Sequence, residues 1–168
     1  MFLLVFCWVS VLVVNRVAAS FAEQMATGHP LIKPGNRLPD LLLDRLPIIS
    51  YKVPETITAL MVLNALSNQN HALTFLQTSL PVFCMRAIVI CCTYYPTPML
   101  LSPHFGQSAY DLMFSGHTTM LFSAAYSVST YAMAGLGALS IIAARQHYTA
   151  DVVVAACITE LVKRALRC

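Results

Sequence analysis

The chain has 168 residues, of which 58% are hydrophobic and only 10% are charged, and its formal net charge is +3. Soluble domains usually carry about 25% charged residues, so this composition lacks the polar surface of a water-soluble domain and indicates residence in a bilayer. The net charge is small and no basic run stands out, which argues against a nucleic-acid partner.

The first predicted element is a membrane helix over residues 2–22, although Asn15 and Arg16 lie in its second half. A cleaved signal peptide is the alternative, because the A-A-S stretch at 18–20 resembles a cleavage site. Against it, no basic region precedes the apolar run, as one normally would in a signal peptide.

A polar loop is predicted next, over residues 23–52, because this segment holds four prolines and seven charged residues. A short amphipathic piece is expected at 41–43. Pro54 then opens a second span over 54–67, in a position where a first helical turn tolerates proline. Residues 67–70, S-N-Q-N, predict a turn.

A third span is predicted over 72–95, with a kink at Pro81 and an embedded charge at Arg86. Prolines mark a second polar loop that runs to about residue 110, and the last 50-odd residues are predicted to be helical again. The sequence therefore predicts one domain, 1–168, with an all-α fold: a polytopic membrane helix bundle of about six helices, two of them shortened.

The six cysteines lack the regular spacing of a secreted disulfide scaffold. All except the terminal Cys168 lie in apolar runs, so they are interpreted as small, lipid-compatible hydrophobic residues. The chain has no C-x-x-C pair that could hold zinc. We therefore expect neither disulfides nor a metal site.

Two short motifs carry the chemistry: S-G-H-T at 115–118 and H-Y-T-A-D at 147–151. Ser115 is a good helix N-cap, and the backbone N–H groups at a helix N-terminus favour a bound phosphate. His147 and Asp151 are spaced i, i+4, so on a helix they would share one face and the carboxylate would orient the imidazole. Each motif alone is ordinary, but ionisable residues in a membrane protein point to function.

These residues can cleave a phosphodiester. His147 would attack phosphorus and form a phosphohistidine, and protonated His117 would protonate the leaving oxygen. The N–H groups of 116–118, with Arg86 or Arg145, would hold the phosphate. For Arg86, pairing with an aspartate or snorkelling to a headgroup is the alternative. The other three histidines have no spaced partner and are interpreted as ordinary surface residues.

Orientation follows from connectivity rather than from charge. The 23–52 loop carries four basic residues and the tail carries three, so positive-inside counting does not decide. If the three predicted spans each cross, the loops 23–52 and 96–112 share one side. The predicted site then lies at that face, because His117 follows the second loop.

Four blocks of the chain resemble, in order, segments of the sphingomyelin synthase family, a branch of the type 2 phosphatidic-acid phosphatase superfamily. The two specific blocks are D-L-M-F-S-G-H-T at 111–118 and H-Y-T-A-D-V at 147–152. The other two are L-P-D at 38–40 and R-x6-T-x-x-P-x-P at 86–98. The resemblance covers about residues 2 to 162.

The resemblance implies a six-span enzyme of the Golgi or plasma membrane whose site faces the lumen or cell exterior. It implies transfer of a phosphocholine-type headgroup from a glycerophospholipid to ceramide, without a metal or cofactor, and related members use ethanolamine or inositol phosphate donors. The expected partners are the bilayer and these two lipids, with a second copy of the chain as a further candidate. The transferred catalytic triad is His117, His147 and Asp151. The expected substrate-binding residues are Arg86, Asp111, Ser115, Gly116, Thr118 and Tyr148.

The chain departs from the family pattern in three places. Ala109-Tyr110 stands where the family has C-G, and the chain starts in its first span, without the cytosolic extension of animal members. Only 29 residues separate the two catalytic histidines, which leaves about 13 residues, or roughly 20 Å, for each leg of a hairpin against a hydrocarbon core near 30 Å. The turn is expected at Gly135 and Gly137. Either the hairpin spans incompletely or the chain is a shortened product.

Two alternatives to a headgroup transferase remain. A lipid phosphate phosphatase of the same superfamily normally has arginine six residues before the second histidine, and Ile141 at that position argues against it. A non-catalytic membrane protein, such as a shortened inactive paralogue, is the alternative from a different class.

Overall fold

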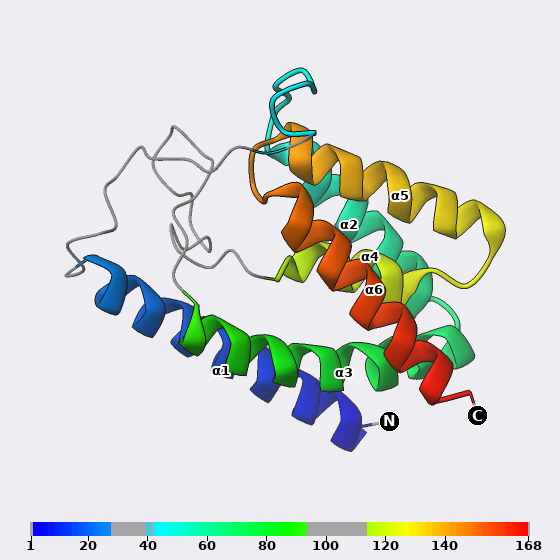
Figure 1. Ribbon diagram of the computed structural model, residues 1–168. Coiled ribbons are helices and arrows are strands. Elements are labelled where there is room, and N and C mark those ends of the chain that lie inside the picture. The colour runs from blue at the N-terminus through cyan, green and yellow to red at the C-terminus, as the bar shows by residue number, and fades with distance from the viewer. Residues whose placement is uncertain (1, 28–39, 41, 94–113, 168) are drawn as a thin grey trace.

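The computed structural model describes residues 2–27, 40, 42–93 and 114–167. Within these ranges all regular secondary structure is helical, in six helices and without a strand (Figure 1). The predicted all-α class of about six helices is therefore confirmed.

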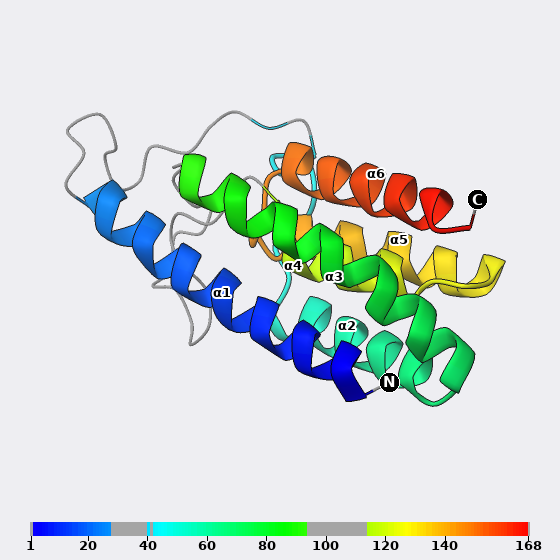
Figure 2. The ribbon, with the colours of Figure 1, turned by 90° about the horizontal axis from the view of Figure 1, so that it is seen from below.

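The two longest helices, α1 (Phe2–Thr27) and α3 (Gln69–Cys92), lie side by side (Figures 1 and 2). Buried alanines of α1 pack against Ala87 and Ile90 of α3, and such small residues let two helix backbones approach closely. Among the described residues, Phe2–Ala22 and Gln69–Cys92 are the two segments long and apolar enough to cross a membrane. Pro81 does not divide α3, which continues through it as one helix.

The other four helices are shorter: α2 (Lys52–Leu66), α4 (Gly116–Ala124), α5 (Val128–Ala143) and α6 (Thr149–Ala165). The 15 residues of α2 extend about 22 Å, less than the roughly 30 Å of a hydrocarbon core. The crossing expected at 54–67 is therefore corrected to a helix too short to span by itself. The turn expected at 67–70 is confirmed, because the Asn68 side chain caps α3.

One hydrophobic core joins the short helices to α3. Phe75 of α3, Leu121 of α4 and Ile141 of α5 are each at most 1% exposed, and Leu43 from the segment before α2 is fully buried with them. The predicted amphipathic piece near 41–43 thus contributes the core residue Leu43, which lies within a turn over 42–45.

The turn between α4 and α5 lies earlier than expected. Ser127 caps α5 in a capping box with Thr130, so the chain reverses at 125–127 rather than at the two glycines, which both lie inside α5. A Cβ at Gly137 would come within 2.7 Å of Leu121 Cδ1, whereas none of the described atoms lies within 4 Å of a Cβ at Gly135. Gly137 therefore allows close helix packing, and the legs have nine and 16 residues instead of about 13 each.

A buried lysine ties α4 to α6. Lys163, 2% exposed, donates from Nζ to the carbonyl oxygens of Phe122, at 2.7 Å, and Ala125. These carbonyls lie at the C-terminal end of α4, where helix carbonyls lack their usual intrahelical donors. The Phe122 carbonyl also accepts from the Ala125 N–H at 3.3 Å. Glu160 lies 4.0 Å from the same ammonium group and accepts from the Tyr131 hydroxyl at 3.0 Å.

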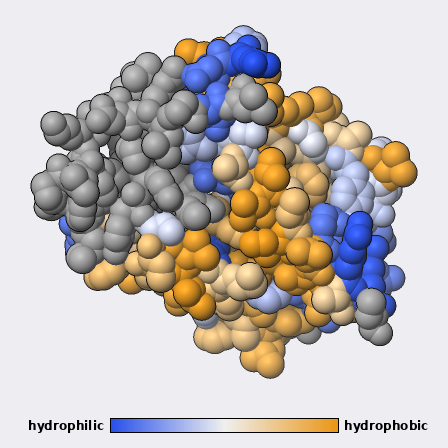
Figure 3. Space-filling view, in the orientation of Figure 1, coloured by the Kyte–Doolittle hydropathy of each residue, from blue (hydrophilic) through white to orange (hydrophobic). Residues whose placement is uncertain are grey.

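The outer surface of the bundle is apolar. Large side chains such as Phe6, Ile88 and Leu161 are each more than 60% exposed, and Figure 3 shows a broad apolar area on the viewed face. Soluble monomers rarely expose continuous apolar surface on this scale. Together with the two apolar helices, this surface indicates a membrane protein.

The bundle has two distinct ends. At one end, which we call the histidine end, α4 and α6 begin and the 42–51 segment packs, with Ile49 N–H donating to the Ala143 carbonyl at 3.3 Å. At the opposite end α2 and α4 finish and α3 and α5 begin (Figure 1).

Candidate active site

The N-terminus of α4 is capped as the sequence predicted. Ser115 Oγ accepts from the Thr118 N–H at 3.2 Å and from the Thr118 hydroxyl at 2.9 Å. Both side chains are fully buried, so they build the cap, and a role for them in substrate binding stays a prediction. Among the described residues, the N–H groups of Gly116 and His117 have no acceptor and are positioned to meet an anion.

Arg86 stabilises this cap through a hydrogen bond to the residue before Ser115. Its Nε donates to the Phe114 carbonyl at 2.8 Å, and its Nη1 donates to Asn15 Oδ1 of α1 at 3.0 Å. A Cβ at Gly116 would lie 3.4 Å from Arg86 Nε, so the backbone and the guanidinium approach closely here. Asn15 in turn donates to the Phe83 carbonyl at 2.8 Å. The polar residue in the first apolar run thus orients Arg86.

A strained residue precedes the second histidine. The N–H groups of Arg145 and Gln146 donate to the carbonyls of Ile142 and Ile141, which is the hydrogen-bond pattern of a Schellman motif ending α5. Arg145 has φ of 60°, the one positive φ among the described non-glycine residues, a conformation that costs about 1–2 kcal/mol outside glycine. This turn directs His147 toward the start of α6.

Asp151 orients the start of α6 and faces His147. Its Oδ2 accepts from the Tyr148 N–H at 3.0 Å and lies 3.6 Å from His147 Nδ1. Because α6 begins at Thr149, His147 precedes the helix, and the expected common helix face is corrected. The two residues meet because a carboxylate three residues after the N-cap reaches back over the helix end.

His117 lies near both His147 and Arg86. Burial, with smaller contributions from the neighbouring His147 and Arg86, lowers the pKa of His117 from 6.5 to about 4. The His147 and Arg86 side chains therefore lie close enough to His117, at the histidine end, to act on its charge. The His117 ring is neutral near neutral pH, and an anion placed among these groups would favour its protonation.

Several buried polar atoms next to this site lack a partner. Among the described residues, Arg145 Nη1, both side-chain polar atoms of Gln146 and His147 Nδ1 have no hydrogen bond. Buried polar groups are usually satisfied, so three consecutive residues with such atoms form an unusual cluster. Its position directly before α6 is consistent with a site completed by a polar ligand.

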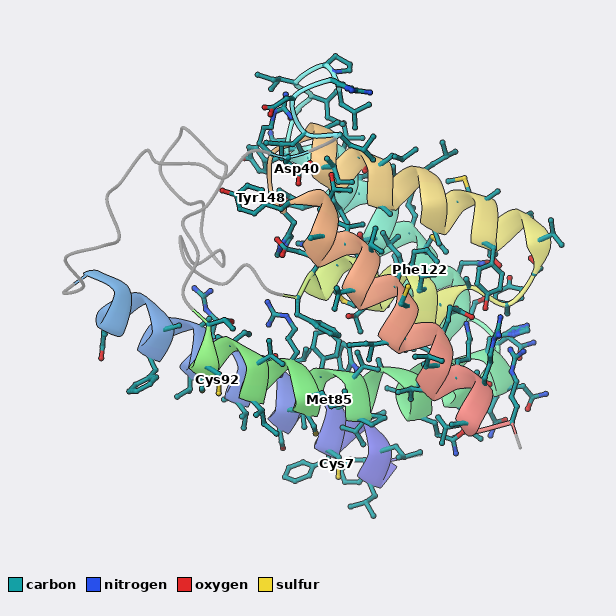
Figure 4. All side chains as sticks on the ribbon, viewed as in Figure 1. Cys7, Asp40, Met85, Cys92, Phe122 and Tyr148 are labelled. Carbon is teal, nitrogen blue, oxygen red and sulfur yellow. The ribbon has the colours of Figure 1, made fainter. Side chains whose placement is uncertain are left out.

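Asp40 connects the first loop to the same helix end. Its carboxylate accepts from the N–H groups of Leu42 and Leu43, and from both the N–H, at 2.7 Å, and the hydroxyl of Thr149. Partial burial acts to raise the pKa of Asp40, but the hydrogen bonds outweigh it and hold the pKa below 3.8. Figure 4 shows Asp40 and Tyr148 at this end of the bundle.

Comparison with known proteins gives a family match over the part of the chain that carries this site. Residues 109–167 match the family model described as PAP2 superfamily C-terminal. The match supports the type 2 phosphatidic-acid phosphatase superfamily. It covers about a third of the chain and includes both histidine motifs. No curated protein gave a significant match.

Members of this superfamily are phosphatases or phosphotransferases, so the match supports a membrane enzyme that acts on lipid phosphate esters. The structure brings together eight of the nine residues predicted for the site: His117, His147, Asp151, Arg86, Ser115, Gly116, Thr118 and Tyr148. Asp111 lies outside the described residues. Their catalytic and binding roles stay predictions.

Two residues at the site were not assigned a role from the sequence. Asn15 is a polar residue in an apolar run, and that pattern is the signal for a buried hydrogen bond. Asp40 belongs to the L-P-D block, but its contact with Thr149 joins positions 109 residues apart, which no local pattern indicates.

The lowered pKa of His117 predicts a pH-dependent stability. Between pH 6.5 and about 4 the unfolded chain binds a proton that folded His117 does not, so stability falls as the pH falls through this window. We expect Tm in detergent to decrease from pH 7 to pH 4, with a smaller decrease for His117→Gln. Equal decreases in the two proteins would contradict the assignment.

The Asp40–Thr149 contact predicts a coupled loss of activity toward lipid phosphate esters. Asp40→Ala and Thr149→Val are each expected to lower the turnover rate by on the order of tenfold, because both release the start of the helix that carries Asp151. The double variant should lose little more than either single variant, because the two changes remove one interaction.

The matched control for this double-mutant cycle is Glu55→Ala, which removes an exposed carboxylate from the first turn of α2 and should keep the parent rate. Additive losses from Asp40→Ala and Thr149→Val would show that the two residues act independently.

Proposed function

We propose that this chain transfers a phospho-headgroup from a glycerophospholipid to ceramide, as the sphingomyelin synthase branch of the superfamily does. The observation that carries the proposal is the grouping of His147 against Asp151 with His117 at the N-terminus of a neighbouring helix. The four sequence blocks that resemble this branch support the choice within the superfamily. We place the reaction at the lumenal or exoplasmic face of the Golgi or plasma membrane.

In the first step His147 acts as the nucleophile. Its Nδ1 faces the Asp151 carboxylate at 3.6 Å, so a proton held there leaves the Nε2 lone pair free to attack phosphorus. Such contacts tighten when a substrate binds. The new bond joins Nε2 to phosphorus, and the bond from phosphorus to the diacylglycerol oxygen breaks.

His117 supplies the proton for the leaving oxygen. Because burial and the nearby Arg86 guanidinium keep it neutral in the free site, its protonation accompanies binding of the phosphodiester anion. The N–H groups of Gly116 and His117 would hold the phosphate oxygens, with Arg86 placing this helix start through the Phe114 carbonyl.

In the second step ceramide takes the headgroup. Its primary hydroxyl attacks the phosphohistidine and gives its proton to His117, while the bond between phosphorus and Nε2 breaks. His147 then returns to its initial state, and the proton that His117 takes up replaces the one it gave to the leaving oxygen. Water is not a reactant in either step.

A lipid phosphate phosphatase is the second candidate, since water could replace ceramide in the second step. The superfamily match supports this reaction class equally. Position 141, where phosphatases normally have an arginine, holds an isoleucine that is fully buried in the core. This buried isoleucine favours the transferase.

The test uses the full chain reconstituted in vesicles. Labelled ceramide with phosphatidylcholine, and separately with phosphatidylethanolamine, should give a labelled phospho-ceramide and an equal amount of diacylglycerol. Release of inorganic phosphate from phosphatidic acid without transfer would establish the phosphatase instead. Absence of turnover on all these lipids would identify a non-catalytic membrane protein.

A further inference from the structure

A polar cavity lies at the opposite end of the bundle from the histidines. Its volume is about 250 Å³, slightly below the roughly 300 Å³ at which pockets for drug-sized ligands begin. It is lined by Asn70, His71, Thr74, Ser123, Ala124, Ala125, Tyr126 and Arg167. These residues come from the first turns of α3, the end of α4, the turn that follows α4, and the turn directly after α6.

One wall of the cavity is already ordered. The rings of His71 and Tyr126 are stacked, with centroids 3.7 Å apart and planes 9° from parallel. The Tyr126 hydroxyl accepts from Asn64 Nδ2 at 2.9 Å, which ties this wall to α2. The cavity therefore needs no rearrangement of these rings before a ligand enters.

A buried hydroxyl in the cavity wall lacks a partner. Ser123 is 2% exposed, and its Oγ has no hydrogen bond to any described residue. An unsatisfied buried hydroxyl is costly, and none of its neighbours in the lining satisfies it. An acceptor atom of a ligand in the cavity would remove this cost.

The charge of the lining favours an anion. Among the described residues that line the cavity, Arg167 is the cation and none is an aspartate or glutamate. The N-terminal end of the 24-residue helix α3 faces the cavity through Asn70 and His71, whose N–H groups donate to the Asn68 side chain, so α3 contributes through its dipole. Glu160 does not line the cavity; it accepts from the Tyr131 hydroxyl at 3.0 Å and lies 4.0 Å from Lys163 Nζ.

We propose that this cavity binds a phosphate group, with the Arg167 guanidinium and the Ser123 hydroxyl donating to its oxygens. The ligand is a lipid headgroup phosphate or a small free phosphate ester. The site is separate from the proposed reaction, because all of its residues lie at the other end of the bundle. Its occupancy would hold the ends of α3, α4 and α6 together.

The experiment measures binding by Tm shift with the full chain in phosphatidylcholine nanodiscs, in the His147→Ala background so that no lipid is turned over. One arm adds phosphatidic acid to the nanodiscs, and the other adds inorganic phosphate at constant ionic strength. A shift with the lipid alone identifies a headgroup, and a shift with inorganic phosphate identifies a free phosphate. Either result supports the site, whereas no shift in both arms overturns it.

Two variants locate the binding. Arg167→Gln should weaken the apparent affinity by about tenfold or more, because it removes a charge-assisted hydrogen bond. Arg164→Gln is the matched control: it removes the same charge from an exposed residue of the same helix end that does not line the cavity. Equal weakening by both variants would assign the effect to general surface charge and overturn the site.

Ser123→Ala separates binding from folding. It deletes an unpaired hydroxyl, so Tm without ligand should stay equal or rise, while the affinity for phosphate should fall several-fold. Unchanged affinity in Ser123→Ala together with unchanged affinity in Arg167→Gln would contradict the proposal. Because the readout is binding, a failure here is distinguishable from a failure of the proposed transferase activity.

Discussion

Replacing His147 by glutamine is expected to abolish headgroup transfer, with a loss of at least about a thousandfold. Glutamine keeps the size and polarity of the side chain but cannot form a phosphoryl intermediate, and removing a covalent nucleophile usually costs at least this much. The measurement is the initial rate of phospho-ceramide formation in vesicles that contain equal amounts of protein. The Tm of each protein checks that it is folded.

His29→Gln is the control for this change, because His29 has no spaced partner in the sequence. It should keep the parent rate. A His147→Gln protein that still transfers headgroups within tenfold of the parent would exclude a phosphohistidine on this residue. After incubation with ³²P-phospholipid, label on His147 of the parent protein and none on the His147→Gln variant would support the intermediate directly.

Replacing Lys163 by methionine is expected to destabilise the protein by about 3 kcal/mol, a fall in Tm of about 6 to 12 °C. Methionine fills a similar volume but leaves the Ala125 carbonyl without its donor and the Phe122 carbonyl with the Ala125 N–H alone. It also removes the cation beside Glu160. The lost charged hydrogen bonds to buried acceptors are the physical cause of the destabilisation.

The same change should lower lipid turnover even where the protein stays folded. The C-terminal end of α4 is held against α6 by this lysine, and α4 carries His117 while α6 follows His147. The control is Arg164→Met, an exposed residue adjacent in sequence, which should shift Tm by less than about 1 °C. A Tm equal to the parent in Lys163→Met would contradict the proposed capping role.

Helix type was predictable because it depends on local composition. Long apolar runs predict α1 and α3. Ser115 predicts the start of α4, because an N-cap depends only on the residues next to it. The turn of the hairpin was misplaced because glycine has two uses. Gly137 serves close packing against Leu121, a contact between two helices that sequence alone does not show, whereas Ser127 and Thr130 form the actual cap.

The relation between His147 and Asp151 was half predictable. Their spacing of four was correctly associated with contact, but the helix starts one residue after Tyr148 rather than before His147. The contact arises from the helix cap, where the Asp151 carboxylate bonds the Tyr148 N–H. The positive φ of Arg145 ends α5 at this point, and a non-glycine residue in that conformation is rarely predictable from local sequence.

The sequence by itself determined the helical, apolar character of the chain, the cap at Ser115 and the two histidine motifs, because each depends on residues within a few positions of one another. Only the tertiary structure decided that Asn15 orients Arg86, that Asp40 accepts hydrogen bonds from Thr149, and that Lys163 caps the C-terminal carbonyls of α4. These contacts join residues 38 to 109 positions apart, and their energy comes from satisfying buried polar groups that become buried only when the bundle packs.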